Sequence, residues 1–284
     1  MDRIYEDTKF LMKKYGITAN KKLGQNFLID ENVIDTIANA SEISKEDFVI
    51  EIGPGLGTLT DKLLQKAGKV VAIELDERMI TILKDRFFMY DNFEIINEDV
   101  LKVDLEKLIK ENKENLKLKN AKIVANLPYY ITTPIIMKLL EEKLDIESIT
   151  VMIQREVADR LTAIPGEKES GAITYTVYYY ATSEEVLTVP NNSFIPEPEV
   201  ESEVIRLDLR KEPPIKIKDE KKFFALIKAA FMQRRKTFLN AIGNSGLDIS
   251  KEKMEQILQE LNIDTKIRGE ALTIEQFAKI VERI

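Results

Sequence analysis

Four consecutive residues, Asn126, Leu127, Pro128 and Tyr129, carry groups suited to chemistry on an exocyclic amine. The side-chain oxygen of Asn126 and a backbone carbonyl near Pro128 could accept the two amine hydrogens, which would turn the nitrogen lone pair toward an electrophile. Proline stiffens this backbone, and the ring of Tyr129 offers a surface on which a flipped-out base could stack. A turn shaped by Asn and Pro is the alternative. The segment follows a predicted strand, residues 123–125, at the end where ligands of open α/β sheets bind, and this position favours the catalytic interpretation.

The chain contains no cysteine and no histidine. This composition excludes disulfides, thiolate nucleophiles, zinc sites built on Cys or His, and histidine general bases. We therefore expect no metal, and a reaction that depends on carboxylates, amides, backbone groups or a cofactor that carries the reactive group. Methyl transfer to an adenine amine meets this condition, because the nitrogen loses its proton easily once methylation has made it cationic.

A glycine-rich turn and a later carboxylate predict a nucleotide-like cofactor. Glycine occupies alternate positions of the turn, at Gly53, Gly55 and Gly57. The turn follows the predicted strand 48–52, where glycine allows both the sharp reversal and the close approach of a ligand. Glu74 ends the next predicted strand, and a carboxylate there can accept hydrogen bonds from both ribose hydroxyls. The glycines alone also fit a structural turn or an NAD site, although Thr58 replaces the last glycine of the NAD fingerprint.

Two further side chains are candidates for contacts with a base. Asp99 follows the predicted strand 93–96, and its carboxylate could accept a hydrogen bond from an adenine amino group or cap a helix. These two roles are compatible. Phe194 precedes two prolines, Pro196 and Pro198, and could stack on the second face of the substrate base. Ordinary core packing of Phe194 is the alternative.

Apolar runs alternate with helix-periodic stretches over the first half of the chain. The predicted strands are residues 48–52, 70–74, 93–96, 123–125 and 149–153. Helical stretches between them include residues 58–66, 104–113 and 134–143, and Asp30 caps an earlier amphipathic helix. This alternation predicts an α/β fold with a Rossmann-like, doubly wound parallel sheet.

The remaining sequence predicts a second, smaller domain. Residues 171–189 stay open, because residues 174–180 within them fit either a strand or a helix, and residues 204–209 alternate like a strand. Pro213 and Pro214 interrupt the chain. The stretches beyond them are all helix-periodic and comprise residues 223–242, 254–261 and 273–284. We therefore predict a catalytic, cofactor-binding domain over residues 1–211, with a basic N-terminal extension, and a small all-α domain over residues 212–284.

Positive charge is concentrated in two parts of an acidic chain. The formal net charge is −7, yet residues 211–245 contain nine Lys or Arg against three acidic residues, and residues 1–24 contain six against three. Binding of nucleic-acid phosphates needs such clusters of cations. Three consecutive cations, Arg234, Arg235 and Lys236, cannot all lie on one helix face, which favours RNA contact over a merely solvated face.

Together these motifs resemble the small-subunit (16S) ribosomal RNA adenine dimethyltransferases, the kasugamycin-resistance family. The segments that carry the resemblance are residues 23–28, 51–60, 73–76, 126–129, 194–198, 202–207 and 231–237. The resemblance implies S-adenosyl-L-methionine as the cofactor and residues 126–129 as the catalytic motif. It also implies dimethylation of the N6 amines of two adjacent adenosines near the 3′ end of the RNA, with a role in small-subunit maturation. The residues implied to contact the cofactor are Asn26, Leu28, Gly53, Glu74, Asp99 and Asn126.

Three other functions are weighed against this one. The macrolide-resistance methyltransferases modify an adenine of the large-subunit RNA, but residues 231–237 and 268–273 resemble the helical domain of the small-subunit family. An NAD-dependent oxidoreductase is disfavoured by Thr58 and by the lack of histidine. A ribosome-assembly factor that binds RNA without catalysis can coexist with the enzyme.

The expected partners are the small ribosomal subunit and its RNA. Hydrophobic residues make up 44% of the chain and charged residues 32%, which is typical of globular proteins. No apolar run reaches membrane-spanning length, and the N-terminal residues lack the basic-then-apolar order of a secretory signal. We expect a cytoplasmic monomer that does not contact membranes.

Overall fold

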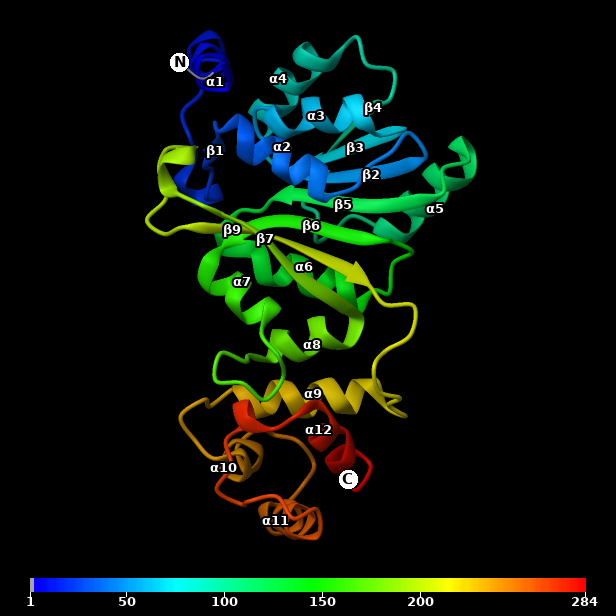
Figure 1. Cartoon of the computed structure of the whole chain (residues 1–284), viewed down its shortest axis with the longest axis vertical. Helices are drawn as coiled ribbons and strands as arrows, with labels where there is room; N and C mark the ends of the chain where they lie inside the picture. Colours follow the sequence, from blue (N-terminus) through cyan, green and yellow to red (C-terminus); the bar gives the residue numbers. More distant parts are fainter. Residues whose placement is uncertain (1–2) are drawn as a thin grey trace. The chain divides into compact units, whose positions relative to one another are not determined.

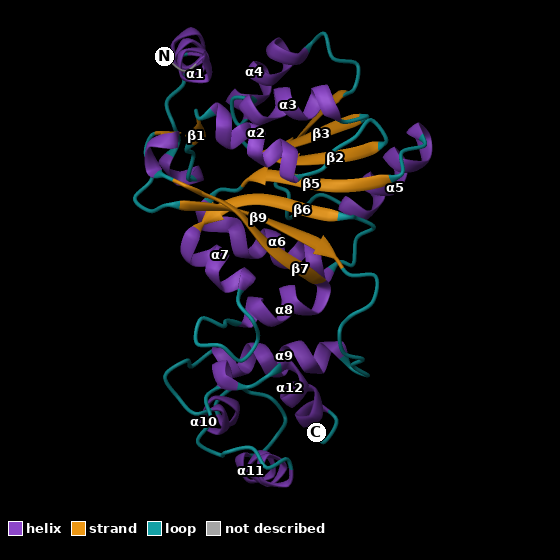
Figure 2. Ribbon diagram, in the orientation of Figure 1, coloured by secondary structure: helices purple, strands orange, loops and turns teal. Residues whose placement is uncertain are grey.

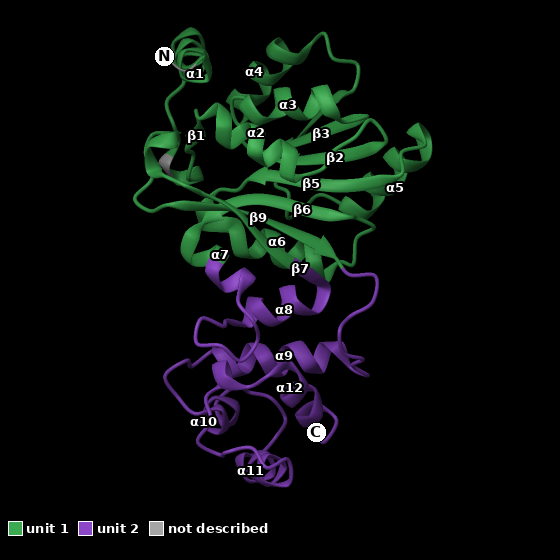
Figure 3. Ribbon diagram, viewed as in Figure 1, with its two compact units in different colours: residues 1–158, 183–209 green, residues 159–182, 210–284 purple. Residues whose placement is uncertain are grey.

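The computed structural model describes residues 3–284, except the side chain of Lys21. The apolar strands form a central sheet, and amphipathic helices pack against it. The chain folds into two compact units (Figure 3). The first unit runs to residue 158 and includes residues 183–209, and the second contains residues 159–182 and 210–284. The first unit carries the sheet and the second is helical (Figure 2).

The central sheet has seven strands in the order β4-β3-β2-β5-β6-β9-β7. Their bounds, in chain order, are β2 Asp47–Ile52, β3 Lys69–Glu74, β4 Phe93–Asn97, β5 Asn120–Asn126, β6 Ser148–Gln154, β7 Ala181–Val189 and β9 Ser202–Leu209. Strands β2 to β6 are parallel, and β9 is antiparallel to β6. All five strands predicted in the first half of the chain are confirmed, as is the strand at residues 204–209. The sheet is mixed rather than wholly parallel.

Helices cover both faces of this sheet. The helices of this part of the chain are α2 Glu31–Ala40, α3 Thr58–Lys66, α4 Glu77–Phe87, α5 Leu105–Leu116, α6 Thr132–Glu141 and α7 Arg155–Thr162. Helices α2, α3 and α4 lie on one face of the sheet and α6 lies on the other (Figure 1). Asp30 begins α2 as predicted, because its carboxylate accepts hydrogen bonds from the N–H groups of Asn32 and Val33. These features confirm the doubly wound, Rossmann-like architecture.

The N-terminal part of the first unit contains a helix that the sequence pattern did not predict, α1 Arg3–Tyr15. An ion pair of 2.9 Å joins Asp7 to Arg86 of α4, and the hydroxyl of Tyr15 donates to Asp85 at 2.8 Å. A 3-10 turn, η1 Lys21–Leu23, and a short strand, β1 Phe27–Leu28, follow. Strand β1 pairs antiparallel with β8 Phe194–Ile195. The N-terminal segment is therefore fastened to α4 and to β8.

The second unit is mainly helical, and it includes the second half of α7 and the first two residues of β7. Its other helices are α8 Ala172–Tyr180, α9 Glu220–Phe231, α10 Phe238–Gly243, α11 Lys251–Glu260 and α12 Ile274–Val281, with 3-10 turns such as η4 Gly269–Ala271. The segment that stayed open, residues 171–189, contains one helix and one strand, because residues 172–180 form α8 and residues 181–189 form β7. Tyr175 and Tyr179 of α8 pack with Phe223 in the core of this unit. Residues 159–182 thus pack with the C-terminal helices, whereas the sequence analysis placed them in the first domain.

The helix predicted over residues 223–242 is wrong in one respect, because the chain leaves the helix after α9 and re-enters it at α10. Thr237 explains the interruption, since its hydroxyl accepts a hydrogen bond from the N–H of Asn240 and so begins α10. Among the residues that the structure describes, no helix is long and apolar enough to cross a membrane.

Candidate active site

The predicted site residues meet at the carboxyl ends of the parallel strands. Gly53 follows β2, Glu74 ends β3, Asp99 follows β4 and Asn126 ends β5. The order of the strands reverses between β2 and β5, and ligands of open α/β sheets bind at such a switch point. The sheet therefore brings together residues that lie as far apart in the sequence as Gly53 and Asn126.

Two adjoining cavities open at this edge. The first is lined by Asn26, Leu28 and Asn126, among others. The second is lined by Glu74 and Asp99, among others. Gln25, Gly53 and Pro128 line both, so the two cavities share a wall.

The glycine turn needs glycine for conformation and for space. Gly53, Gly55 and Gly57 all have positive φ, at 68°, 57° and 82°. A Cβ added at Gly57 would lie 2.6 Å from the ring of Phe87, so a side chain there would force α4 away from the turn. The N–H of Gly55 donates to the carboxylate of Glu74 at 3.2 Å. The turn is thereby tied to the carboxylate that the sequence analysis assigned to a ribose.

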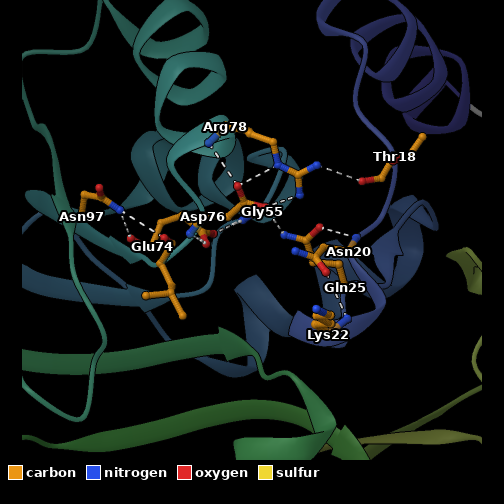
Figure 4. A network of polar contacts seen from close by, with 10 residues as sticks. Thr18, Asn20, Lys22, Gln25, Gly55, Glu74, Asp76, Arg78 and Asn97 are labelled. Carbon is orange, nitrogen blue, oxygen red and sulfur yellow. Dashed lines mark hydrogen bonds and ion pairs between the residues drawn. The ribbon is translucent and has the colours of Figure 1, made fainter.

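Glu74 is 7% exposed and accepts two backbone hydrogen bonds (Figure 4). Oε2 accepts from Gly55, and Oε1 accepts from the N–H of Asp76 at 2.8 Å. Burial raises the pKa of the Glu74 carboxyl, while these N–H donors act in the opposite direction. The side chain is held in one orientation beside the second cavity, and each carboxylate oxygen keeps a lone pair for a further donor.

Asp99 caps a turn rather than a helix, and its contact with an adenine amino group stays a prediction. The cap of α5 is Asp104, which accepts from the N–H of Lys107 at 2.9 Å. Asp99 instead caps the preceding turn, where Oδ1 accepts from the N–H of Leu101 at 3.0 Å. The same half-buried side chain lines the second cavity.

Asn126 is oriented by the N-terminal loop. Its Nδ2 donates to the backbone carbonyl of Asn26 at 3.3 Å, so Oδ1 is the end of the carboxamide left to accept. The carbonyl of Pro128 already accepts from the N–H of Ile131 at 3.2 Å and from Oγ1 of Thr132 at 3.1 Å. Of the carbonyls near Pro128, that of Leu127 is therefore the better candidate for a second acceptor.

Tyr129 and Phe194 have different surroundings. The hydroxyl of Tyr129 lies 2.6 Å from Oγ of Ser202, burial raises the pKa of the phenol, and the side chain lines the first cavity. Phe194 is 2% exposed, belongs to the core of the first unit and pairs with Leu28 across the β1–β8 ladder. This placement matches the core-packing alternative, and Phe194 is not among the residues that line these two cavities. Its stacking on a base stays a prediction.

The basic run lies in the turn between α9 and α10 of the second unit. Arg234 is partly engaged within that unit, because Nη2 donates to the carbonyl of Ser170 at 3.3 Å and lies 3.8 Å from the carboxylate of Glu270. Arg235 and Lys236 are exposed and line an open hollow together with the preceding residues of the turn. Of the three cations, these two are the freer to meet a phosphate.

Two further residues line the cavities although no role was predicted for them from the sequence. Glu51 is 1% exposed and lines the first cavity, and Thr60 donates to it at 2.6 Å. Burial raises the pKa of Glu51 to about 8. A charged residue inside the apolar run 48–52 was the signal for it. Gln25, which lines both cavities, lay within the marker segment 23–28 but was given no role.

The chain resembles known ribosomal RNA methyltransferases over its whole length. Residues 16–284 match the family described as ribosomal RNA adenine dimethylase. The chain is 48% identical over 286 aligned positions to a ribosomal RNA small subunit methyltransferase A from Alkaliphilus oremlandii, with 100% of this chain and 99% of that protein covered.

Two solved structures share the fold over most of the chain. One is a dimethyladenosine transferase from Plasmodium falciparum, at a TM-score of 0.73 and 26% identity over 89% of this chain and 95% of that one. The other is the 23S rRNA methyltransferase ErmE, at a TM-score of 0.67 and 25% identity over 91% of this chain and 99% of that one. The resemblance drawn from the sequence motifs is confirmed, and the chain belongs to the ribosomal RNA adenine dimethylase family.

Proposed function

We propose that this protein transfers methyl groups from S-adenosyl-L-methionine to the N6 amines of two adjacent adenosines near the 3′ end of small-subunit ribosomal RNA. The product is N6,N6-dimethyladenosine, and the reaction contributes to maturation of the subunit. The observation that carries the proposal is the carboxamide of Asn126, held by Asn26 at the switch point of the sheet. The small subunit is favoured over the large one because the relative of that name is 48% identical, against 25% for ErmE.

The residues around the two cavities fit the chemistry of this cofactor. Glu74 presents a buried carboxylate for the ribose hydroxyls, and Asp99 presents a half-buried carboxylate for the adenine amino group. Asn26, Leu28 and Gly53 line the first cavity and would enclose the rest of the molecule. When bound, S-adenosyl-L-methionine supplies a methyl group on a positively charged sulfur.

The catalytic contribution of the protein is to orient an amine. Oδ1 of Asn126 and the carbonyl of Leu127 accept the two hydrogens of the exocyclic nitrogen, which directs its lone pair out of the plane of the base. The hydrogen bond to Asn26 keeps the carboxamide from turning its Nδ2 toward the amine. Tyr129 stacks on the base, which is worth ~1–3 kcal/mol in single-strand recognition.

Recognition of the ribosomal subunit is assigned to the basic run of the second unit. Arg235 and Lys236 contact phosphates, with Arg234 beside them. The protein acts as a monomer, since the first unit alone contributes every residue assigned to catalysis and to the cofactor. A cytoplasmic location follows from the ribosomal substrate.

The test is transfer of labelled methyl from S-adenosyl-L-methionine to ribosomal particles, followed by mapping of the labelled nucleotides. The wild-type protein should label two adjacent adenosines of unmethylated small subunits. Asn126→Ala should abolish transfer and leave subunit binding intact, whereas Asn39→Ala, at an exposed position on α2, should leave transfer unchanged. Label in the large subunit, no label at all, or full transfer by Asn126→Ala would refute the proposal.

A further inference from the structure

A chain of hydrogen bonds joins the N-terminal loop of the first unit to the carboxylate of Glu74 (Figure 4). Gln25 uses both ends of its side-chain amide. Nε2 donates to Oδ2 of Asp76 at 2.9 Å, and Oε1 accepts from the N–H of Asn20 at 2.9 Å. Asp76, which is 8% exposed, donates its own N–H to Oε1 of Glu74 at 2.8 Å. One path therefore runs from the loop to the carboxylate assigned to the ribose.

Arg78 fixes the other side of Asp76 (Figure 4). Its Nε donates to Oδ1 at 2.9 Å, its Nη2 donates to Oδ2 at 2.5 Å, and its backbone N–H donates to Oδ1 at 3.1 Å. Nη1 reaches the carbonyl of Thr18 at 3.4 Å, so the guanidinium also touches the N-terminal segment. The guanidinium of Arg78 lowers the pKa of the Asp76 carboxyl, which therefore stays an anionic acceptor for Gln25.

The residue after Gln25 contacts the proposed catalytic segment. The carbonyl of Asn26 accepts the hydrogen bond that orients Asn126. Gln25 itself lines both cavities, and Leu28 lines the first. A shift of Gln25 would therefore move a wall of the cofactor site and release the carboxamide of Asn126.

We propose that Gln25 and Asp76 are positioning residues that clamp the loop of residues 24–28 over the site, so that cofactor affinity and the orientation of Asn126 depend on one contact. The inference rests on the proposed function. The clamp needs a neutral amide, because the side chain at this position must donate to a carboxylate and accept from an N–H. The charged groups that face it are Asp76, Glu74 and Arg78.

The substitution Gln25→Glu turns this requirement into a pH-dependent readout. At low pH the introduced carboxyl binds a proton and can donate to Asp76, which restores the clamp. At higher pH two carboxylates face each other and repel, because like charges at this distance cannot both ionise without cost. Relative to wild type, affinity for S-adenosyl-L-homocysteine should be about tenfold weaker at pH 8, and the loss should shrink as the pH falls to 5.5.

Two variants serve as controls in the same calorimetric titrations. Gln25→Met keeps the size of the side chain but cannot make either hydrogen bond, and it should bind more weakly at both pH values. Gln65→Glu, at an exposed position on α3, replaces a side chain that donates to Asp61 at 3.0 Å by a carboxyl, and its affinity should equal that of wild type at both pH values. Since the half-buried Gln25 lies in a loop, all three variants should unfold at temperatures close to that of wild type.

Methyl transfer in a single turnover separates positioning of Asn126 from binding. With saturating S-adenosyl-L-methionine and unmethylated small subunits, Gln25→Met should still react more slowly than wild type, because the carboxamide of Asn126 is no longer held in place. The proposal would be refuted if Gln25→Met reacted at the wild-type rate at saturating cofactor. It would also be refuted if the affinity of Gln25→Glu equalled that of wild type at every pH from 5.5 to 8. If wild type itself fails to bind S-adenosyl-L-homocysteine, the proposed function fails instead.

Discussion

The buried carboxyl of Glu51 should make the protein less stable as the pH rises, and Glu51→Gln should remove this effect. Glu51 is 1% exposed, and its one hydrogen bond from Thr60 does not offset the loss of solvation, so its pKa is raised to about 8. In the unfolded chain the same carboxyl has the ordinary value of 4.5. Between these values the folded state holds a proton that the unfolded state has released.

The sign and size of the effect follow from proton linkage. Stability falls with pH wherever the folded state binds more protons, with a slope of at most ~1.4 kcal/mol per pH unit for one group. The contribution of Glu51 is complete below pH 4.5 and is lost as the pH rises toward 8. From pH 5 to pH 8 the wild type should therefore lose roughly 3 kcal/mol relative to Glu51→Gln.

Chemical denaturation at several pH values measures this difference, and comparison with the variant cancels the titration of all other groups. The gap between the two unfolding free energies should widen in favour of Glu51→Gln above pH 5. Glu106→Gln, at an exposed position on α5, is the matched control and should give no such divergence. Parallel curves for wild type and Glu51→Gln would show that the carboxyl is ionised in the folded protein and would refute the reasoning.

Three further predictions concern the proposed activity. Tyr129→Ala should slow single-turnover methyl transfer ~5- to 150-fold through lost stacking, whereas Tyr129→Phe, which loses only the contact with Ser202, should stay near wild type; equal losses would remove the stacking role. Glu74→Ala should weaken binding of S-adenosyl-L-homocysteine at least ~100-fold, because two charge-assisted hydrogen bonds are lost, and an unchanged titration would exclude the ribose contact. Replacing Arg235 and Lys236 together by alanine should lower the affinity for the subunit. The slope of log affinity against log salt concentration, measured by filter binding, should fall by about 1 to 2. An unchanged slope would show that neither side chain contacts a phosphate.

Local patterns in the sequence were sufficient for six of the seven strands of the central sheet, all but β7, and for the edge at which the site lies. Strands buried on both faces appear as short apolar runs, and the residues of the carboxyl edge stand at their ends, as Glu74 ends β3 and Asn126 ends β5. In a parallel sheet these ends must meet, so Gly53, Glu74, Asp99 and Asn126 could be placed together before their contacts were known.

Periodicity failed where burial does not follow one face of an element. In α8, residues on every side are buried, including Thr174, Tyr175, Thr176 and Val177, so no pattern distinguished a helix from a strand. The turn between α9 and α10 was missed for a different reason, because residues 233–237 are all polar and contain neither glycine nor proline to mark the end of a helix. The cap formed by Thr237 shows where the second helix begins.

The sequence by itself determined the fold class, and it singled out the candidate cofactor edge and the candidate catalytic segment, because these depend on spacing along a short stretch of chain. Tertiary structure decided which side chains hold that segment in place. Gln25 is hydrogen-bonded to Asp76, 51 residues away in the sequence, and Asn26 is hydrogen-bonded to Asn126, 100 residues away. Neither contact can be predicted from the periodicity of the sequence. The loop of residues 24–28 has only the two-residue strand β1 as regular structure, so its conformation is fixed by those distant partners and becomes visible only once the sheet has assembled.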